Sequence, residues 1–141
     1  MTKPTHLRID VGDLGFVARL ETTLAPLTCA AFLRSLPFED RLIQTRWSGE
    51  SAWIPMGERD VGVGVENAII EPAPGQILLY PKAISETEIL FPYGITRFAS
   101  KFGPLAGNHF LTLTEGMEQL EEVGKRVLYQ GAQPIRFAAS S

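Results

Sequence analysis

The fold of this chain is decided by residues 75–110, GQILLYPKAISETEILFPYGITRFASKFGPLAGNHF. Two apolar runs in this stretch, GQILLYP and TEILFPYG, are short and bounded by glycine and proline, and each predicts a β-strand. Charged and aromatic side chains follow these runs more densely than either a core or a solvated surface requires. The stretch therefore predicts two strands and a loop that form the wall and rim of a binding pocket.

Further strands are expected on both sides of this stretch. Residues 6–12 (HLRIDVG) and 16–21 (FVARLE) alternate in hydrophobicity around a glycine turn and predict a hairpin. The glycine-rich residues 61–70 (VGVGVENAII) are expected to be extended. Three more segments each predict one strand: residues 40–47 (DRLIQTRW), 51–56 (SAWIPM) and 108–114 (NHFLTLT). Residues 126–138 (RVLYQGAQPIRFA) predict one or two strands that close the chain.

Two segments show the helical period instead. Residues 25–37 (APLTCAAFLRSLP) carry Pro26 where a first helical turn tolerates it and Pro37 as an end. Residues 115–126 (EGMEQLEEVGKR) predict a second helix, which Gly124 is expected to end. With about seven to nine strands, the prediction is a mainly β protein: a closed barrel of about eight strands with a short helix plugging each end. The length of 141 residues argues for one domain over residues 1–141.

Composition argues against several function classes. The formal net charge is −3 and the basic residues are scattered, so nucleic acid is not an expected partner. No apolar run approaches the roughly 20 residues of a membrane helix, and residues 1–10 lack the apolar core of a secretory signal. The single cysteine, Cys29, excludes an internal disulfide framework, which makes a reducing cytoplasm the default location. Two histidines and one cysteine argue against zinc, and no metal or cofactor is expected.

Three blocks of the sequence resemble a bacterial and archaeal family of cyclophilin-like domains of unknown function: RWSGESAW (residues 46–53), SETEILFPYG (85–94) and FASKFGPLAGNHFLTLTEG (98–116). The resemblance implies a cyclophilin-like β-barrel with two helices, which agrees with the element count. It also implies homo-oligomers, with hexamers as one form, and a pocket that includes Tyr80 and Lys82. It implies no established reaction.

Substrate-binding candidates begin with residues 46–50 (RWSGE), which set three useful groups at a predicted strand end. Arg46 is expected to bind a carboxylate or an amide oxygen, Trp47 to supply a flat apolar wall, and Glu50 to add a carboxylate. The alternative is a surface pair of Arg46 and Glu50 beside a core tryptophan. Farther along the chain, Tyr93 is a candidate pocket donor and Arg97 a charge at the rim.

Tyr80 and Lys82 are the first catalytic candidates. They lie one strand repeat apart, so the phenol and the ammonium are expected to face the same side and to polarise a carbonyl or move a proton. The alternative is a lysine at a loop tip with its charge in water.

Glu88 and His109 are the other candidates for proton transfer. Glu88 shares a strand side with Glu86 and borders the apolar part of its strand, whereas a solvated acidic face is the alternative. His109 alternates with Leu111 and Leu113, so the alternative for it is a satisfied histidine on an apolar face.

Three functions are compatible with these residues. The first is a small-molecule enzyme, or an accessory subunit of one, that acts on an amide- or carboxylate-bearing metabolite. The second is a peptidyl-prolyl isomerase, which rests on the fold resemblance and on Arg46, although the Phe-His pair of true prolyl isomerases is missing. The third is a non-catalytic oligomeric binding protein with an interface at residues 61–70. We favour the first over the second, and the sequence does not separate the first from the third.

Overall fold

Strands dominate the protein, for which a computed structural model describes residues 4–140. The strands are β1 (His6–Val11), β2 (Leu14–Leu20), β3 (Phe38–Gln44), β4 (Gly49–Gly57), β5 (Ala68–Ile69), β6 (Gln76–Tyr80), β7 (Thr87–Thr96), β8 (Ala99–Ser100), β9 (Gly103–Pro104), β10 (Gly107–Glu115) and β11 (Gln133–Ala139). The α-helices are α1 (Pro26–Leu33) and α2 (Leu120–Tyr129), and 3₁₀ turns occupy Arg46–Ser48 and Met117–Gln119. Neither helix of the described chain is long and apolar enough to cross a membrane.

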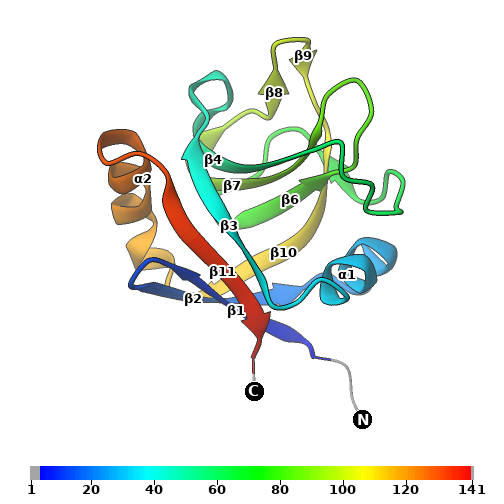
Figure 1. Ribbon diagram of the computed structural model, residues 1–141, viewed down its shortest axis with the longest axis horizontal. Coiled ribbons are helices and arrows are strands. Elements are labelled where there is room, and N and C mark those ends of the chain that lie inside the picture. Colours follow the sequence, from blue (N-terminus) through cyan, green and yellow to red (C-terminus); the bar gives the residue numbers. More distant parts are fainter. Residues whose placement is uncertain (1–3, 141) are drawn as a thin grey trace.

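Eight of these strands close into an antiparallel barrel (Figure 1). Neighbouring strands follow the order β2-β1-β11-β3-β4-β7-β6-β10, and the pairing of β10 with β2 closes the ring. The short strand β5 pairs with the end of β10, and β8 and β9 form a separate hairpin. The sequence prediction of a mainly β, closed barrel with two helices is confirmed.

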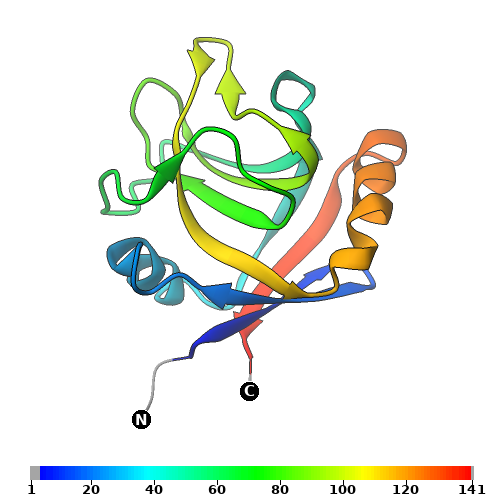
Figure 2. The same ribbon diagram turned by 180° about the vertical axis from the view of Figure 1, so that it is seen from behind.

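The main core fills the barrel and reaches both helices. Phe32 of α1 packs its ring against Phe110 and Phe137, with ring centroids 5.2 and 5.1 Å apart. Val123 and Val127 bring α2 into the same core. Each fully buried side chain of this size contributes roughly 1.5–3 kcal/mol to folding. The two helices lie on opposite sides of the barrel, and α1 packs against β10 (Figure 2).

A second apolar cluster lies outside the barrel wall, and we call it the outer cluster: Leu78, Tyr80, Leu90, Phe98 and Leu105. Successive side chains of a strand point to opposite faces. β6 therefore sends alternate residues into the main core and into the outer cluster. This double burial explains why β6 and β7 appear in the sequence as continuous apolar runs instead of alternating ones.

Two local predictions are wrong. Gly124 does not end the second helix, because α2 continues to Tyr129. A Cβ at Gly124 would overlap the Tyr93 ring, so this glycine is needed for close packing inside the helix. The first residues of the expected closing strand at 126–138 are therefore helical, and β11 starts only at Gln133. Residues 61–70 form no regular ladder apart from the two-residue strand β5, as their glycines led us to expect.

Candidate functional site

Glu88 lies in β7 on the face that points away from the barrel interior. The strand register pairs it with Tyr80 of β6 and Pro55 of β4. Because side chains alternate along a strand, the next residue, Ile89, enters the main core, whereas Glu88 and Leu90 point outward. The chain therefore builds a carboxyl group into the side of the outer cluster.

The Glu88 carboxyl is buried without the partners that a buried carboxylate requires. The residue is only 2% exposed, and Oε2 has no hydrogen-bond partner among the described residues. Burial, and secondly the nearby charge of Glu86, raise the pKa of Glu88 to about 8. At neutral pH the group is therefore mostly a neutral carboxylic acid, which can donate one O–H and still accept.

A cavity of about 370 Å³ opens beside this carboxyl, and we call it the Glu88 cavity. Its lining residues are Trp47, Trp53, Ser85, Glu86, Glu88, Ser100 and Lys101. The rings of Trp47 and Trp53 meet edge to face, with centroids 5.4 Å apart and planes at 87°. The volume is typical of a site for a small ligand, and two indoles beside a few polar groups are a typical lining.

The 3₁₀ turn Arg46–Ser48 presents Trp47 to the cavity. Ser48 is buried, and its Oγ accepts a hydrogen bond from the Ala99 N–H at 3.1 Å and donates to the Ala99 carbonyl at 3.2 Å. Gly49 follows with φ of +96°, where an added Cβ would lie 2.7 Å from a carbonyl oxygen of β7. The turn is therefore locked between β7 and β8, although the Trp47 indole itself is half exposed.

The segment 97–105 covers the outer cluster and brings a cation to the cavity. Phe98 is fully buried and packs edge-on against Tyr80, with ring centroids 5.8 Å apart. The β8–β9 hairpin then turns back, so that the Leu105 N–H donates to the Phe98 carbonyl at 2.9 Å. Lys101 lies in the turn of this hairpin and lines the Glu88 cavity.

Three of the predicted substrate-binding residues line a different hollow beside α2, which we call the Tyr93 groove: Arg46, Glu50 and Tyr93. The groove encloses about 610 Å³. The Tyr93 hydroxyl donates to Oε1 of Gln44 at 2.7 Å, and burial raises the pKa of Tyr93. Glu50 Oε1 accepts the Ile95 N–H at 2.8 Å. Both polar groups are thus satisfied by the chain itself.

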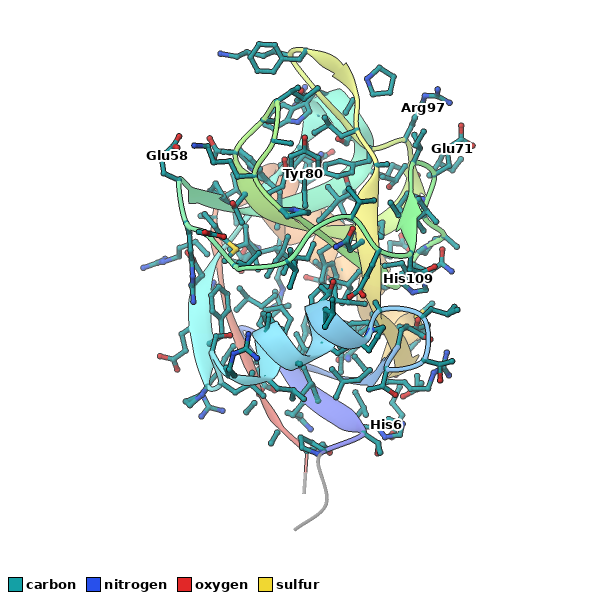
Figure 3. All side chains as sticks on the ribbon, turned by 90° about the vertical axis from the view of Figure 1, so that its right-hand side faces the viewer. His6, Glu58, Glu71, Tyr80, Arg97 and His109 are labelled. Carbon is teal, nitrogen blue, oxygen red and sulfur yellow. The ribbon has the colours of Figure 1, made fainter. Side chains whose placement is uncertain are left out.

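Lys82 and Arg97 lie outside both hollows. Lys82 forms an ion pair with Glu58, and Arg97 forms one with Glu71, all on exposed side chains. Figure 3 shows Arg97 and Glu71 together at one edge of the molecule, with Glu58 at the opposite edge. Lys82 therefore does not continue the face of Leu78 and Tyr80, because the strand ends before it.

His109 faces away from the apolar side that its sequence spacing indicates. The register pairs His109 with Leu78 but Leu111 with Ile77, because a β-bulge interrupts β10 between them. Leu78 belongs to the outer cluster and Ile77 to the main core, so His109 and Leu111 lie on opposite faces. The prediction that His109 shares a face with Leu111 is wrong, since one extra residue reverses the alternation.

His109 belongs to an internal chain of hydrogen bonds. Thr112 donates its hydroxyl proton to Glu21 Oε2 at 2.6 Å, so His109 Nε2 donates to the Thr112 oxygen at 2.7 Å. Burial lowers the pKa of His109, and the Glu21 charge partly offsets this. Figure 3 shows His109 well separated from Tyr80, and His109 is not among the residues that line the Glu88 cavity.

The structure thus brings together only part of the predicted set. Glu88 and Trp47 share one cavity, with Tyr80 directly opposite Glu88 in the sheet. Several lining residues were not candidates from the sequence, among them Trp53 and Lys101. The signal for Trp53 was present, because the chain has two tryptophans and both fall in residues 46–53.

The cavity can orient a flat molecule and exchange a proton with it. The indoles provide apolar contact, and the neutral Glu88 carboxyl provides a donor and an acceptor. Within residues 4–140, no three side chains of histidine, cysteine, aspartate or glutamate lie close enough together to hold a metal ion.

Two solved structures have the same fold. One, described as "Structure of McbB in complex with tryptophan", aligns with 96% of this chain at a TM-score of 0.72 and 14% identity. This chain spans 45% of that McbB chain, less than half of its length. The other is the solution structure of the hypothetical protein AF2241 from Archaeoglobus fulgidus, with a TM-score of 0.60 and 14% identity over 97% of this chain and 95% of that one.

Sequence comparison places the chain in a family. No curated protein shows a significant sequence match. The sequence model of a family described as "Protein of unknown function (DUF3830)" matches residues 7–139, which run from β1 to the end of β11 and include both hollows. The chain therefore belongs to DUF3830, a family of proteins of unknown function.

Proposed function

We propose that this protein binds a small, flat molecule bearing an amide or a carboxylate group in the Glu88 cavity. The observation that carries the proposal is the Glu88 carboxyl, which lines the cavity and has an oxygen without a partner in residues 4–140. A buried polar group left unpaired costs about 1–3 kcal/mol. A ligand that pairs with Glu88 would remove that cost, which gives the cavity a built-in preference for a polar anchor.

An amide matches this anchor best. A protonated carboxyl presents a donor and an acceptor side by side, and an amide presents an acceptor and a donor in the complementary order. A carboxylate ligand would also accept the Glu88 O–H, and Lys101 would balance its charge. The charge of Glu86 opposes a second anion in the same cavity, so a carboxylate is expected to bind less tightly than an amide.

The aromatic walls favour a flat ring system. Trp47 and Trp53 form an edge-to-face pair that lines the cavity, and aromatic contacts contribute about 0.5–1.5 kcal/mol beyond the burial of apolar area. One fold relative is described as a complex with tryptophan, an amino acid that carries an indole. An indole with a short polar arm is therefore a suitable test ligand.

Calorimetry at pH 7 with indole-3-acetamide, indole-3-acetate and tryptamine tests the polar anchor. The three molecules share one ring and differ only at the end of the arm. We expect the amide to bind most tightly and the carboxylate about tenfold less tightly, the difference expected for one good hydrogen bond. Absence of binding by all three, or tightest binding by tryptamine, would overturn the proposal.

Variants distinguish the Glu88 cavity from the Tyr93 groove. Glu88→Leu keeps the size of the side chain but removes its donor and acceptor, and Trp47→Ala removes a half-exposed wall. Both are expected to weaken indole-3-acetamide binding by about tenfold or more. Tyr93→Phe, the matched control in the groove, should leave the affinity unchanged. If only Tyr93→Phe weakens binding, the groove is the site.

The finer sequence predictions also become proposals. We infer that the barrel belongs to the cyclophilin-like class and that the protein forms homo-oligomers in the cytoplasm. Light scattering of the purified protein measures its oligomeric state. A monomer at all concentrations would contradict the proposal of homo-oligomers.

A further inference from the structure

Two carboxyl groups of different character meet in the Glu88 cavity. Glu86 and Glu88 both line it: Glu86 directly precedes β7, Glu88 is the second residue of that strand, and the charge of Glu86 contributes to the raised pKa of Glu88. Glu88 is buried, with an unpartnered oxygen, whereas Glu86 is partly exposed to water. Such a pair, one acid kept neutral by its surroundings and one carboxylate in contact with solvent, is suited to general acid and general base roles.

We propose that Glu86 and Glu88 together catalyse the keto–enol isomerisation of a ketone whose neighbouring carbon carries a flat aromatic group. This inference rests on the proposed function, because it requires that the Glu88 cavity bind a flat aromatic molecule through a polar group that pairs with Glu88. Glu88 acts as the acid on the carbonyl oxygen, and Glu86 acts as the base on the neighbouring carbon. Trp47 and Trp53 hold the aromatic group.

The proton and electron balance needs no other reactant. The Glu88 O–H bond breaks as its proton moves to the carbonyl oxygen. The electron pair of the C–H bond forms the new C=C bond, and the π pair of the carbonyl forms the new O–H bond. The Glu86 carboxylate takes the proton from carbon. The reverse step restores both groups, and Glu86 can exchange its proton with water in between.

The charges around the cavity support this division of roles. The neutral Glu88 carboxyl can donate at neutral pH, because burial disfavours its ionised form. Lys101 also lines the cavity, with its ammonium over the Phe102 ring, 5.2 Å from the ring centroid. The outer cluster supplies the apolar surroundings that keep Glu88 protonated.

Deuterium exchange of 2-indanone followed by proton NMR tests the inference. 2-Indanone is a flat bicyclic ketone about the size of indole, and its CH₂ groups adjoin both the carbonyl and the ring. In D₂O near neutral pH, we expect the protein to accelerate loss of the CH₂ signal about 10²-fold or more over buffer, as positioned acid–base catalysis does. The rate should fall on the alkaline side of neutrality as Glu88 ionises.

Variants assign the two roles. Glu88→Leu is expected to abolish the acceleration. Glu86→Gln should lower the exchange rate at least tenfold, while calorimetry shows that 2-indanone still binds. Tyr93→Phe, which changes only the groove, should exchange as fast as the unmodified protein.

The outcomes separate this inference from the proposed function. Binding of 2-indanone with exchange at the rate of buffer would overturn the isomerisation and leave the binding function standing. Binding of indole-3-acetamide but not of 2-indanone would overturn the assignment of aromatic ketones as substrates. Failure of every ligand to bind would overturn the proposed function itself.

Discussion

The Glu88 cavity and the Tyr93 groove begin at the same turn, residues 46–50, but their polar groups are in opposite states. In the groove, the Tyr93 hydroxyl and the Glu50 carboxylate are already hydrogen-bonded to the chain. In the cavity, Glu88 Oε2 is buried and has no hydrogen-bond partner in the part of the chain that the structure describes. Because native chains satisfy nearly all buried polar groups, an exception marks a ligand site more specifically than a high density of polar residues does.

The largest expected effect concerns the pH dependence of stability. An unfolded glutamate has a pKa of 4.5, whereas the pKa of Glu88 in the folded protein is about 8. Between these values the folded state holds more protons, so stability is full below pH 4.5 and falls as the pH rises through 8. The loss is about 1.4 kcal/mol per pH unit, and Glu88→Gln should abolish it. Urea unfolding at pH 5.5, 6.5 and 7.5 measures the free energy of unfolding of the unmodified protein and of the Glu88→Gln variant.

The groove supplies the control for this measurement. Glu50→Gln changes a carboxylate of the Tyr93 groove and should leave the Glu88 contribution to the slope in place. If the free energy of unfolding changes with pH in the same way for the unmodified protein and for Glu88→Gln, then Glu88 ionises as an ordinary glutamate. The cavity would then not differ from the groove in the state of its polar groups.

Gly124→Ala should destabilise the groove side of the molecule. The added Cβ would overlap the Tyr93 ring, and overpacking of this kind costs about 1–3 kcal/mol. Thermal unfolding measures the loss, and ligand affinity in the Glu88 cavity should not change. With Tyr93→Leu as the background, Gly124→Ala should instead stabilise α2 by up to about 1 kcal/mol, because alanine is the better helix former. A loss in both backgrounds would contradict the packing explanation.

Tyr93→Phe should have a smaller effect. It removes the hydrogen bond to Gln44, which contributes about 0.5–1.5 kcal/mol. Denaturant unfolding measures this change, and Gln44→Leu in combination should add little further, because both changes remove the same bond. Fully additive losses would show that the two side chains act independently.

Lys82→Gln is expected to have the smallest effect of the series. The ion pair of Lys82 with Glu58 is exposed, and such pairs contribute between zero and about 1 kcal/mol. Exchange of 2-indanone should be unchanged, since Lys82 lines neither hollow. A strong loss of exchange in this variant would restore Lys82 as the catalytic candidate and count against Glu86.

Local patterns predicted most of the barrel but not its irregularities. The first hairpin, the first helix and the strands β6 and β7 were predicted because each is specified by neighbours in the sequence. Gly124 was misassigned because a glycine near the end of a helical pattern usually ends the helix. Here its role depends on Tyr93, which is 31 positions earlier in the sequence and belongs to β7. The face of His109 was misassigned because a β-bulge has no reliable local signal.

The site was predicted as a set of residues but not as an arrangement. Glu88 and Trp47 were candidates from the sequence, but so were Arg46 and His109, which lie elsewhere. Their separation is set by strand register and by the turn that sends Arg46 to one side and Trp47 to the other. Lys101 reaches the cavity only because the β8–β9 hairpin turns back over the outer cluster.

The sequence by itself determined that this protein is a β-barrel with two helices and that residues 75–110 are rich in groups suited to binding. Periodicity and turn residues are local properties, so they can be recognised in the sequence alone. Only the tertiary structure decided that Glu88, of all the candidates, is buried beside two indoles with an unpaired oxygen. Burial and the pKa that follows from it depend on what distant segments place around a group, and no local pattern contains that information.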